Sequence, residues 1–356
     1  SWSCADRSMY VIRDVQRSDL PALQKLAREL DTVNLPDDER ELLRIIDWSA
    51  RSFDGRVKNP FQREYLFVLE EPRAERAVGA SLIIAQHGTR DAPHIFFDVY
   101  EKEHYSASVD RHFRHRVLSI GYNFDGPTEI GGLVVDPGYR GGAEKPGKQL
   151  SYVRFLYIAM HPSRFRERVL VELLPKLEED RRSPLWEALG RKFTGLSYQD
   201  ADRLSRENKE FIQQLFPPGE IYATLFSQKI QDAIGEVGPE TAGAKQMLTK
   251  IGFRYDERID PFDGGPHYSA TTREIEPVRG YRRARLSEEE LPADAEPVAG
   301  EIDVRLVAVE RSHGRNRFRA ARALCGFHDA DLRLTSAARD ALAARPGDRL
   351  HTIPFD

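Results

Sequence analysis

The segment from Val134 to Ala159, VVDPGYRGGAEKPGKQLSYVRFLYIA, limits the possible folds more than any other part of the chain. The apolar, β-branched run 130–135 ends at a Pro-Gly turn signal and therefore predicts a strand. Apolar side chains then recur at the spacing of one buried helix face, at Leu150, Val153, Leu156 and Tyr157. A strand, a turn and a helix are thus expected in direct succession.

The turn between this strand and this helix combines glycines with cations. It contains Arg140, Gly141, Gly142, Lys145, Gly147 and Lys148. Glycines let the backbone come close to a ligand, and the first N–H groups of a helix have no partner inside it, so the turn can hold an anion such as phosphate. A solvated surface loop is the alternative. The spacing matches neither G-x-x-x-x-G-K-[ST] nor G-x-G-x-x-G, which argues against a site for a nucleoside triphosphate or a dinucleotide.

Composition narrows the class of protein. The chain has 356 residues, of which 40% are hydrophobic, enough for a large core in two domains or in one domain with additions. Its formal net charge of -4 predicts no nucleic-acid partner. No run approaches the roughly 18 apolar residues of a membrane span, and no signal peptide is visible, so we expect a cytoplasmic protein without a membrane partner. Cys4 and Cys325 show no zinc-site spacing to His, so neither a disulfide nor a metal is expected.

Apolar runs and helical periodicity alternate along the chain. We expect strands over 10–15, 64–69, 78–85, 117–122, 130–135, 169–174, 253–259 and 302–309. Helical spacing begins at an N-cap at Ser18 or Asp19 and recurs over 186–189, 200–216 and 244–251. The runs 64–69 and 78–85 are expected to pair antiparallel, and the run 117–122 is expected to pair with 130–135 in the same way.

This order of elements resembles the GNAT acyltransferase superfamily, in which the turn after the fourth strand cradles the pyrophosphate of an acyl-coenzyme A. Arg140-Gly141-Gly142 with Gly147-Lys148 takes the place of its R/Q-x-x-G-x-G/A signature, in a longer loop that also contains Lys145-Pro146. A narrower resemblance rests on six segments that occur in order: TEIGGLVVDPGYR, LSYVRFLYIA, RSPLWEALGRKF, ADRLSRENKEFI, IGEVGPETAGAKQML and IGFRYDERIDPFDGGP. They resemble the arginine N-succinyltransferase family of bacterial arginine catabolism.

The resemblance implies a fold and an organisation. The fold is α+β, with a GNAT-like mixed, mostly antiparallel central sheet flanked by helices and a small C-terminal β module. Residues 1–8 are expected to be a lead or an expression remnant, and residues 9–278 to form the acyltransferase domain, or a tandem of two GNAT-like folds. The acidic run rich in Pro and Ala makes 279–301 a linker, and 302–356 is the β-rich module.

The resemblance also implies a reaction, the transfer of succinyl from succinyl-CoA to the α-amino group of L-arginine. An amine that attacks a thioester needs a polarised carbonyl and a group that takes its proton. The backbone of Leu133, Val134 and Val135 is expected beside the acyl group, because the corresponding strand lies there in similar enzymes. Glu129 stands at the start of that strand, where some members of the superfamily have a general base. A Glu that is satisfied at a strand end is the other interpretation.

The proton donor departs from the family pattern. A family His assigned to this role corresponds to Gly238 here, and Leu248 stands where many members of the superfamily have a Tyr. A thiolate has a pKa of about 8.5 and can leave without strong acid help, so the loss need not abolish catalysis. His267 and Tyr268 are candidate replacements, and a His that serves only the core or the surface is the alternative.

The sequence does not fix the acceptor amine or the oligomeric state. A guanidinium pairs best with a carboxylate, so Asp260 and Asp263 are candidates for binding arginine, with structural turn residues as the alternative. Two other functions compete: an acyltransferase for ornithine, lysine, a polyamine or a peptide, and a non-catalytic acyl-CoA sensor. We expect a homo-oligomer or a pairing with a related subunit, because related enzymes occur as paired subunits.

Overall fold

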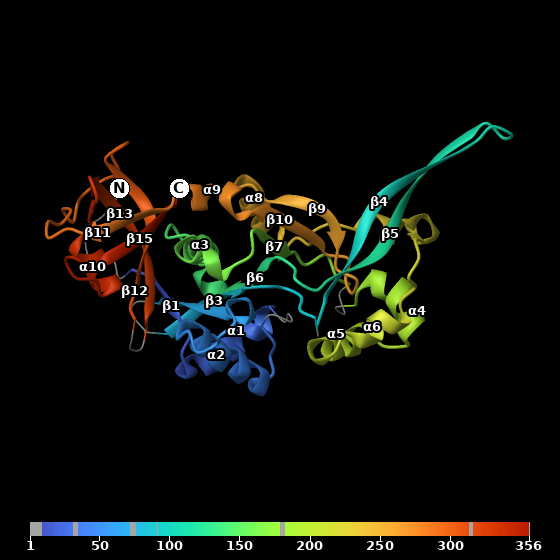
Figure 1. Cartoon of the computed structure of the whole chain (residues 1–356), viewed down its shortest axis with the longest axis horizontal. Coiled ribbons are helices and arrows are strands. Elements are labelled where there is room, and N and C mark those ends of the chain that lie inside the picture. The colour runs from blue at the N-terminus through green and yellow to red at the C-terminus, as the bar shows by residue number, and fades with distance from the viewer. Residues whose placement is uncertain are drawn as a thin grey trace. The chain divides into compact units, whose positions relative to one another are not determined.

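The computed structural model describes residues 9–30, 35–71, 76–90, 92–178, 182–312 and 316–355 (Figure 1). The chain divides into two compact units. Unit 1 contains Ser1–Ala85, Ile130–Arg166 and Thr272–Asp356, and unit 2 contains Gln86–Glu129 and Glu167–Thr271. The expected lead 1–8, which includes Cys4, lies outside the described residues. Among those residues, no helix combines the length and the apolar character needed to cross a membrane.

Unit 1 contains a sheet in the order β12-β15-β11-β14-β13-β1-β2-β3, with β6 next to β3. These strands are β1 (Val11–Asp14), β2 (Glu64–Glu71), β3 (Arg76–Ile84), β6 (Thr128–Val135), β11 (Arg282–Leu286), β12 (Ile302–Glu310), β13 (Phe318–His328), β14 (Asp331–Arg333) and β15 (Arg349–Pro354). The expected linker 279–301 therefore contains a strand, β11, which pairs antiparallel with β15. Its sequence RRARL gives a weak strand signal because only Ala284 and Leu286 face the core.

The helices of unit 1 pack on this sheet. They are α1 (Leu20–Leu30), α2 (Glu39–Phe53), α3 (Pro146–Met160), α9 (Glu276–Arg279) and α10 (Ser336–Leu342). Helix α2 begins where Asp38 accepts a hydrogen bond from the Glu41 N–H, as an N-cap residue does. Apolar faces of α1 and α2 meet β2 and β3 in one core cluster that includes Leu23, Ile45 and Leu66. Helix α3 is buried on nearly every side, so its position is fixed by packing.

Unit 2 contains strands in the order β7-β10-β9-β4-β5-β8. They are β4 (His94–Ser106), β5 (Arg111–Asn123), β7 (Arg168–Glu172), β8 (Ile221–Tyr222), β9 (Arg254–Ile259) and β10 (Pro266–Thr271), and the helices are α4 (Arg191–Thr194), α5 (Tyr198–Glu207), α6 (Glu210–Leu215), α7 (Gln228–Ala233) and α8 (Ala242–Lys250). Trp186–Gly190 forms a turn of π-helix. Trp186 and Leu189 are buried in the core of this unit, as the sequence predicts.

The pairing expected for the run 117–122 is wrong. This run belongs to β5, which pairs antiparallel with β4 along the whole of a long hairpin, drawn in teal in Figure 1. The start of β6 instead pairs parallel with β7, at Thr128 and Glu129. The sequence missed β4 because the second half of this strand, EKEHYS, lies mostly in solvent and shows no buried face. The general class, a chain of mixed helices and strands, is confirmed.

Candidate active site

The turn that follows β6 exposes its backbone. Gly141 has a positive φ of 75°, and a Cβ added at Gly141 or Gly142 would meet no atom within 4 Å. Helix α3 then begins at Pro146, which has no N–H, so the first N–H groups of the helix belong to Gly147 and Lys148. This part of the turn has the open backbone and the helix N-terminus that binding of an anion requires.

Two cationic side chains of this turn have partners within unit 1. Arg140 Nε donates to the carbonyl oxygen of Val135 at 2.8 Å. Lys148 Nζ lies 4.9 Å from the ring centroid of Tyr152 and 4.8 Å from that of Phe355. Both arrangements hold the cations close to the turn, and both leave the glycine backbone uncovered. The turn residues named from the sequence are thus brought together by the structure.

Arg154, on helix α3, is a buried cation that the sequence did not single out. Its side chain is 2% exposed. Its Nη2 donates to Ser151 Oγ at 2.8 Å, and its Nη1 lies 3.5 Å from the carbonyl oxygen of Gly131 in β6. Burial lowers the pKa of Arg154 to about 9, so the guanidinium stays charged at neutral pH. Among the described residues, no carboxylate forms an ion pair with it.

Unit 2 holds a cluster of three imidazoles and two carboxylates. His87 follows β3, and His94 is the first residue of β4. Glu172 is the last residue of β7, and His267 stands directly opposite it in the antiparallel register of β10 and β7. Glu129, the candidate base, is buried at the start of β6, where its Oε2 lies 2.5 Å from His87 Nδ1. The topology therefore gathers residues that are far apart in the sequence.

Glu172 is the centre of this cluster. Its Oε1 lies 3.2 Å from His94 Nε2, 3.4 Å from His267 Nε2 and 3.7 Å from His87 Nε2. Burial would raise the pKa of Glu172, but the imidazoles around it hold that pKa well below its usual range. Burial lowers the pKa of His94 to about 3 and also lowers the pKa of His267. Burial therefore disfavours the protonated imidazolium form of His267, which is the form that a proton donor needs.

His87 differs from the other two imidazoles. Burial alone would lower its pKa, but the negative charge of Glu129 beside it raises that pKa above the ordinary value. The carboxylate of Glu129 therefore favours the protonated form of His87.

Asp260 and Asp263 lie in the turn before β10. Asp260 Oδ1 accepts hydrogen bonds from the N–H groups of Phe262 and Asp263, and Asp263 Oδ1 accepts one from the N–H of Gly265. Burial, followed by the charge of Glu172, raises the pKa of Asp260 to about 7. Carboxylates used in this way support a turn, and they are less suited to bind a guanidinium than fully charged, open ones.

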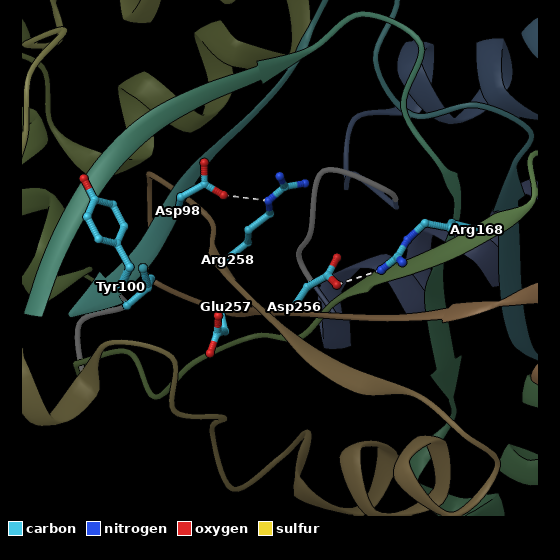
Figure 2. Close-up of a pocket in the computed structure, with 7 residues that line it drawn as sticks. Asp98, Tyr100, Arg168, Asp256, Glu257 and Arg258 are labelled. Carbon is cyan, nitrogen blue, oxygen red and sulfur yellow. Dashed lines mark hydrogen bonds and ion pairs between the residues drawn. The ribbon is translucent and has the colours of Figure 1, made fainter. Parts of the chain in front are cut away.

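An open cavity of about 440 Å³ is lined by residues of β4, β7 and β9 (Figure 2). Figure 2 shows two ion pairs across it, Asp98 with Arg258 and Asp256 with Arg168, each at 2.8 Å. Glu257, also in its lining, has a positive φ of 54°. In each pair the arginine neutralises the aspartate, so most of the charge that lines the cavity is already compensated within unit 2.

Comparison with known proteins decides the family. Residues 10–277 match the family described as arginine N-succinyltransferase beta subunit. The chain is 34% identical over 348 residues to the arginine N-succinyltransferase of Escherichia coli O139:H28, with 97% of each chain covered. The enzyme of the same name from Shigella flexneri gives the same identity and coverage.

The chain belongs to the arginine N-succinyltransferase family.

A solved structure supports the same assignment. The arginine/ornithine succinyltransferase subunit AI from Pseudomonas aeruginosa superimposes with a TM-score of 0.81 at 28% identity, over 98% of this chain and all of that one. Gly238 is the position at which the sequence resemblance leads us to expect the family's proton donor. A Cβ added at Gly238 would lie 2.7 Å from the Pro175 carbonyl oxygen, so the backbone here leaves no room for a side chain.

Sequence reasoning missed His87, His94, Glu172 and Arg154 as site candidates. The three cluster residues are isolated in the sequence, and none has a spacing typical of a motif. Arg154 sits among the apolar residues of α3, and this is a usable signal: a charged residue on a helix that is apolar on every side predicts a buried charge.

Proposed function

We propose that the chain transfers the succinyl group of succinyl-CoA to the α-amino group of L-arginine and releases coenzyme A. The observation that carries the proposal is the family match, which extends over 97% of both chains in curated arginine N-succinyltransferases. The strand, turn and helix around Gly141 supply the anion site that an acyl-CoA requires.

The reaction is a direct aminolysis of the thioester. The lone pair of the neutral amine attacks the carbonyl carbon, and the new C–N bond forms as the C–S bond breaks. The electron pair of the C–S bond leaves on sulfur, and the amine gives up one proton. The protein must therefore bind the pyrophosphate, polarise the carbonyl with the backbone near Leu133, Val134 and Val135, and accept that proton.

Glu129 is the residue that we propose as proton acceptor. It is buried at the start of β6, the strand that also contains Leu133 and Val135. His87 contacts it and so fixes the orientation of its carboxylate. This role predicts a loss of kcat when the carboxylate is replaced, with coenzyme A binding retained.

Arg154 is the feature that favours succinyl over acetyl as the acyl group. A buried guanidinium without a carboxylate partner is unfavourable, and the distal carboxylate of succinyl supplies the missing charge. Its contact with the carbonyl oxygen of Gly131 sets the guanidinium beside β6, two residues before Leu133. We therefore propose that Arg154 binds the succinyl carboxylate.

The substitution Arg154→Met tests this assignment. It removes the charge but keeps the volume of an unbranched side chain, so the fold is retained. We expect the KM for succinyl-CoA to rise at least about tenfold, as for loss of a charge-assisted contact, while the KM for acetyl-CoA stays within a factor of about two. An equal rise for both acyl donors would contradict this role for Arg154.

L-Ornithine is the second candidate acceptor, because the Pseudomonas aeruginosa structure is that of an arginine/ornithine succinyltransferase subunit. The experiment is a thiol-release assay with succinyl-CoA and a panel of arginine, ornithine, lysine and polyamines. Arginine-dependent release supports the proposal, and release with another amine alone contradicts it. We further propose association with itself or with a related subunit, which light scattering of the purified protein can measure.

A further inference from the structure

We infer that His87, His94 and Glu172, with His267 beside them, form a binding site for a divalent transition-metal cation, with Zn²⁺ as the best-suited probe. The sequence predicts no metal, because neither cysteine has a suitable spacing to His. The structure assembles the ligands from three segments instead, which are the residues after β3, the start of β4 and the end of β7, and His267 at the start of β10 lies beside them. This site lies beyond the proposed acyl transfer and does not depend on it.

The spacing of the ligand atoms carries the inference. One ligand atom each from His87, His94 and Glu172 lies within 4.8 Å of the other two. The three Nε2 atoms lie 3.2–3.7 Å from Glu172 Oε1. In a tetrahedral zinc site with metal–ligand distances of about 2.0–2.2 Å, two ligand atoms are separated by roughly 3.4 Å. One cation can therefore contact His87, His94 and Glu172 together, and His267 Nε2 lies beside the same carboxylate oxygen.

The unpaired ring nitrogens of two histidines point to a missing ligand. His94 is 2% exposed and His267 is fully buried. In the part of the chain that the structure describes, neither nitrogen of either ring forms a hydrogen bond, although Glu172 Oε1 lies at ion-pair distance from both Nε2 atoms. Buried polar groups are normally bonded, so a pair of bare imidazoles around one carboxylate requires a further partner.

His87 is oriented by a carboxylate in the way that a metal-binding His usually is. Its Nδ1 faces Glu129 Oε2 at 2.5 Å, which leaves Nε2 on the side of Glu172. Metal-binding histidines commonly contact a carboxylate through their other nitrogen, which fixes the orientation of the ring. The side chain of Glu172 is 28% exposed and that of His87 is 17% exposed, so a cation and a water molecule can reach the cluster from solvent.

Backbone contacts of His87 and Gly88 hold the rings of His87 and His94 together. Gly88 has a positive φ of 84°, and a Cβ there would lie 2.7 Å from the backbone nitrogen of His94. The His87 N–H donates to the carbonyl oxygen of Pro127 at 2.7 Å. The ring centroids of His87 and His94 lie 4.3 Å apart as a result. A cation at this point ties His87 and His94 to Glu172 at the end of β7, and we therefore expect it to stabilise unit 2.

The test uses the full chain purified without a polyhistidine tag. We expect elemental analysis to find close to one equivalent of zinc per chain after addition of Zn²⁺ and dialysis, and the melting temperature to rise with free Zn²⁺. Substitution of Co²⁺ should give the visible absorption of a site of nitrogen and oxygen ligands. A wild-type protein that retains no zinc and melts at the same temperature with and without Zn²⁺ overturns the inference.

Variants locate the site. His94→Gln and Glu172→Gln should each weaken zinc binding by more than about 100-fold. Glu129→Gln removes the carboxylate that contacts His87 Nδ1 and should weaken zinc binding by about 10- to 100-fold. His112→Gln is the matched control, because His112 lies on the exposed part of β5, and it should bind zinc as the wild type does. Circular dichroism shows whether each variant is folded. Zinc binding by folded His94→Gln that equals that of the wild type overturns the assignment.

Two separate measurements distinguish the zinc site from the proposed acyl transfer. Zinc content is measured without any substrate, and thiol release is measured with succinyl-CoA. A protein that binds zinc but releases no thiol contradicts only the proposed acyl transfer. A protein that releases thiol but binds no zinc contradicts only the metal site.

Discussion

Replacement of Gly238 is expected to destabilise the protein and to leave turnover no higher. A Cβ at this position lies 2.7 Å from the carbonyl oxygen and 3.0 Å from the carbonyl carbon of Pro175, and both are backbone atoms. Since an ordinary contact begins at 3.4 Å, the two segments must separate by about 0.7 Å. That movement strains the hydrogen bonds that the Gly238 N–H and Thr241 Oγ1 donate to the carbonyl oxygen of Leu174.

The size of the effect follows from overpacking. Added atoms in a well-packed site lower the free energy of unfolding by about 1–3 kcal/mol. For Gly→Ala, the smaller conformational entropy of the unfolded chain raises it by about 0.4–1 kcal/mol. We therefore expect Gly238→Ala to lower the free energy of unfolding by about 1–2 kcal/mol, and the larger side chain of Gly238→His to lower it further. Each kcal/mol corresponds to a fall in Tm of about 2–4 °C for a domain of this size.

Urea denaturation and thermal melts measure this change, and Gly243→Ala is the matched control. Gly243 lies in helix α8, where an added Cβ meets no atom within 4 Å, so this replacement should stabilise the chain by about 0.5–1 kcal/mol. Gly238→Ala as stable as the wild type would refute the packing argument. Gly238→His with raised turnover and an unchanged Tm would show instead that this position lacks only a proton donor.

Three further outcomes are expected. Arg140→Ala combined with Lys148→Ala should weaken coenzyme A binding, measured by calorimetry, by about 1.5–3 kcal/mol per lost phosphate contact, and an unchanged Kd would place the site elsewhere. Glu129→Gln should lower kcat by about 100-fold with an unchanged Kd for coenzyme A, and an unaffected kcat would make this Glu structural. Burial lowers the pKa of His351 to about 4. Between pH 7 and pH 5 the unfolded chain therefore binds a proton at this residue that the folded chain does not bind. The free energy of unfolding should fall by about 1–2 kcal/mol over this range. His351→Gln should flatten that dependence in urea titrations, and equal slopes would contradict it.

The strand, turn and helix from Val134 to Ala159 are the part of the structure that the sequence predicted best, because their signals are local. The turn after Val135 and the helix that contains Leu150 depend on short-range preferences, and both occur where the sequence places them. Strand pairing is different. Strand β11 forms because β15, far along the chain, provides its partner, and no property of RRARL alone indicates this.

The cluster around Glu172 could not be predicted from the sequence. Its histidines are single residues in otherwise ordinary segments, and a metal site of this kind has no fixed spacing when each ligand comes from a different strand or loop. Only the antiparallel register that sets His267 opposite Glu172, with the tight turn at Gly88, brings them together. The interpretation of Asp260 as a turn residue, by contrast, follows from the local sequence IDPFDGGP and agrees with its hydrogen bonds.

The most direct test of the account is the rate of thiol release from succinyl-CoA by the wild-type chain, with and without L-arginine, and with acetyl-CoA as the matched donor. The account predicts arginine-dependent release with succinyl-CoA, at least about tenfold faster than with acetyl-CoA under the same conditions, and a product whose mass equals that of arginine plus one succinyl group. Thiol release that does not depend on arginine, or that is as fast with acetyl-CoA as with succinyl-CoA, would contradict it.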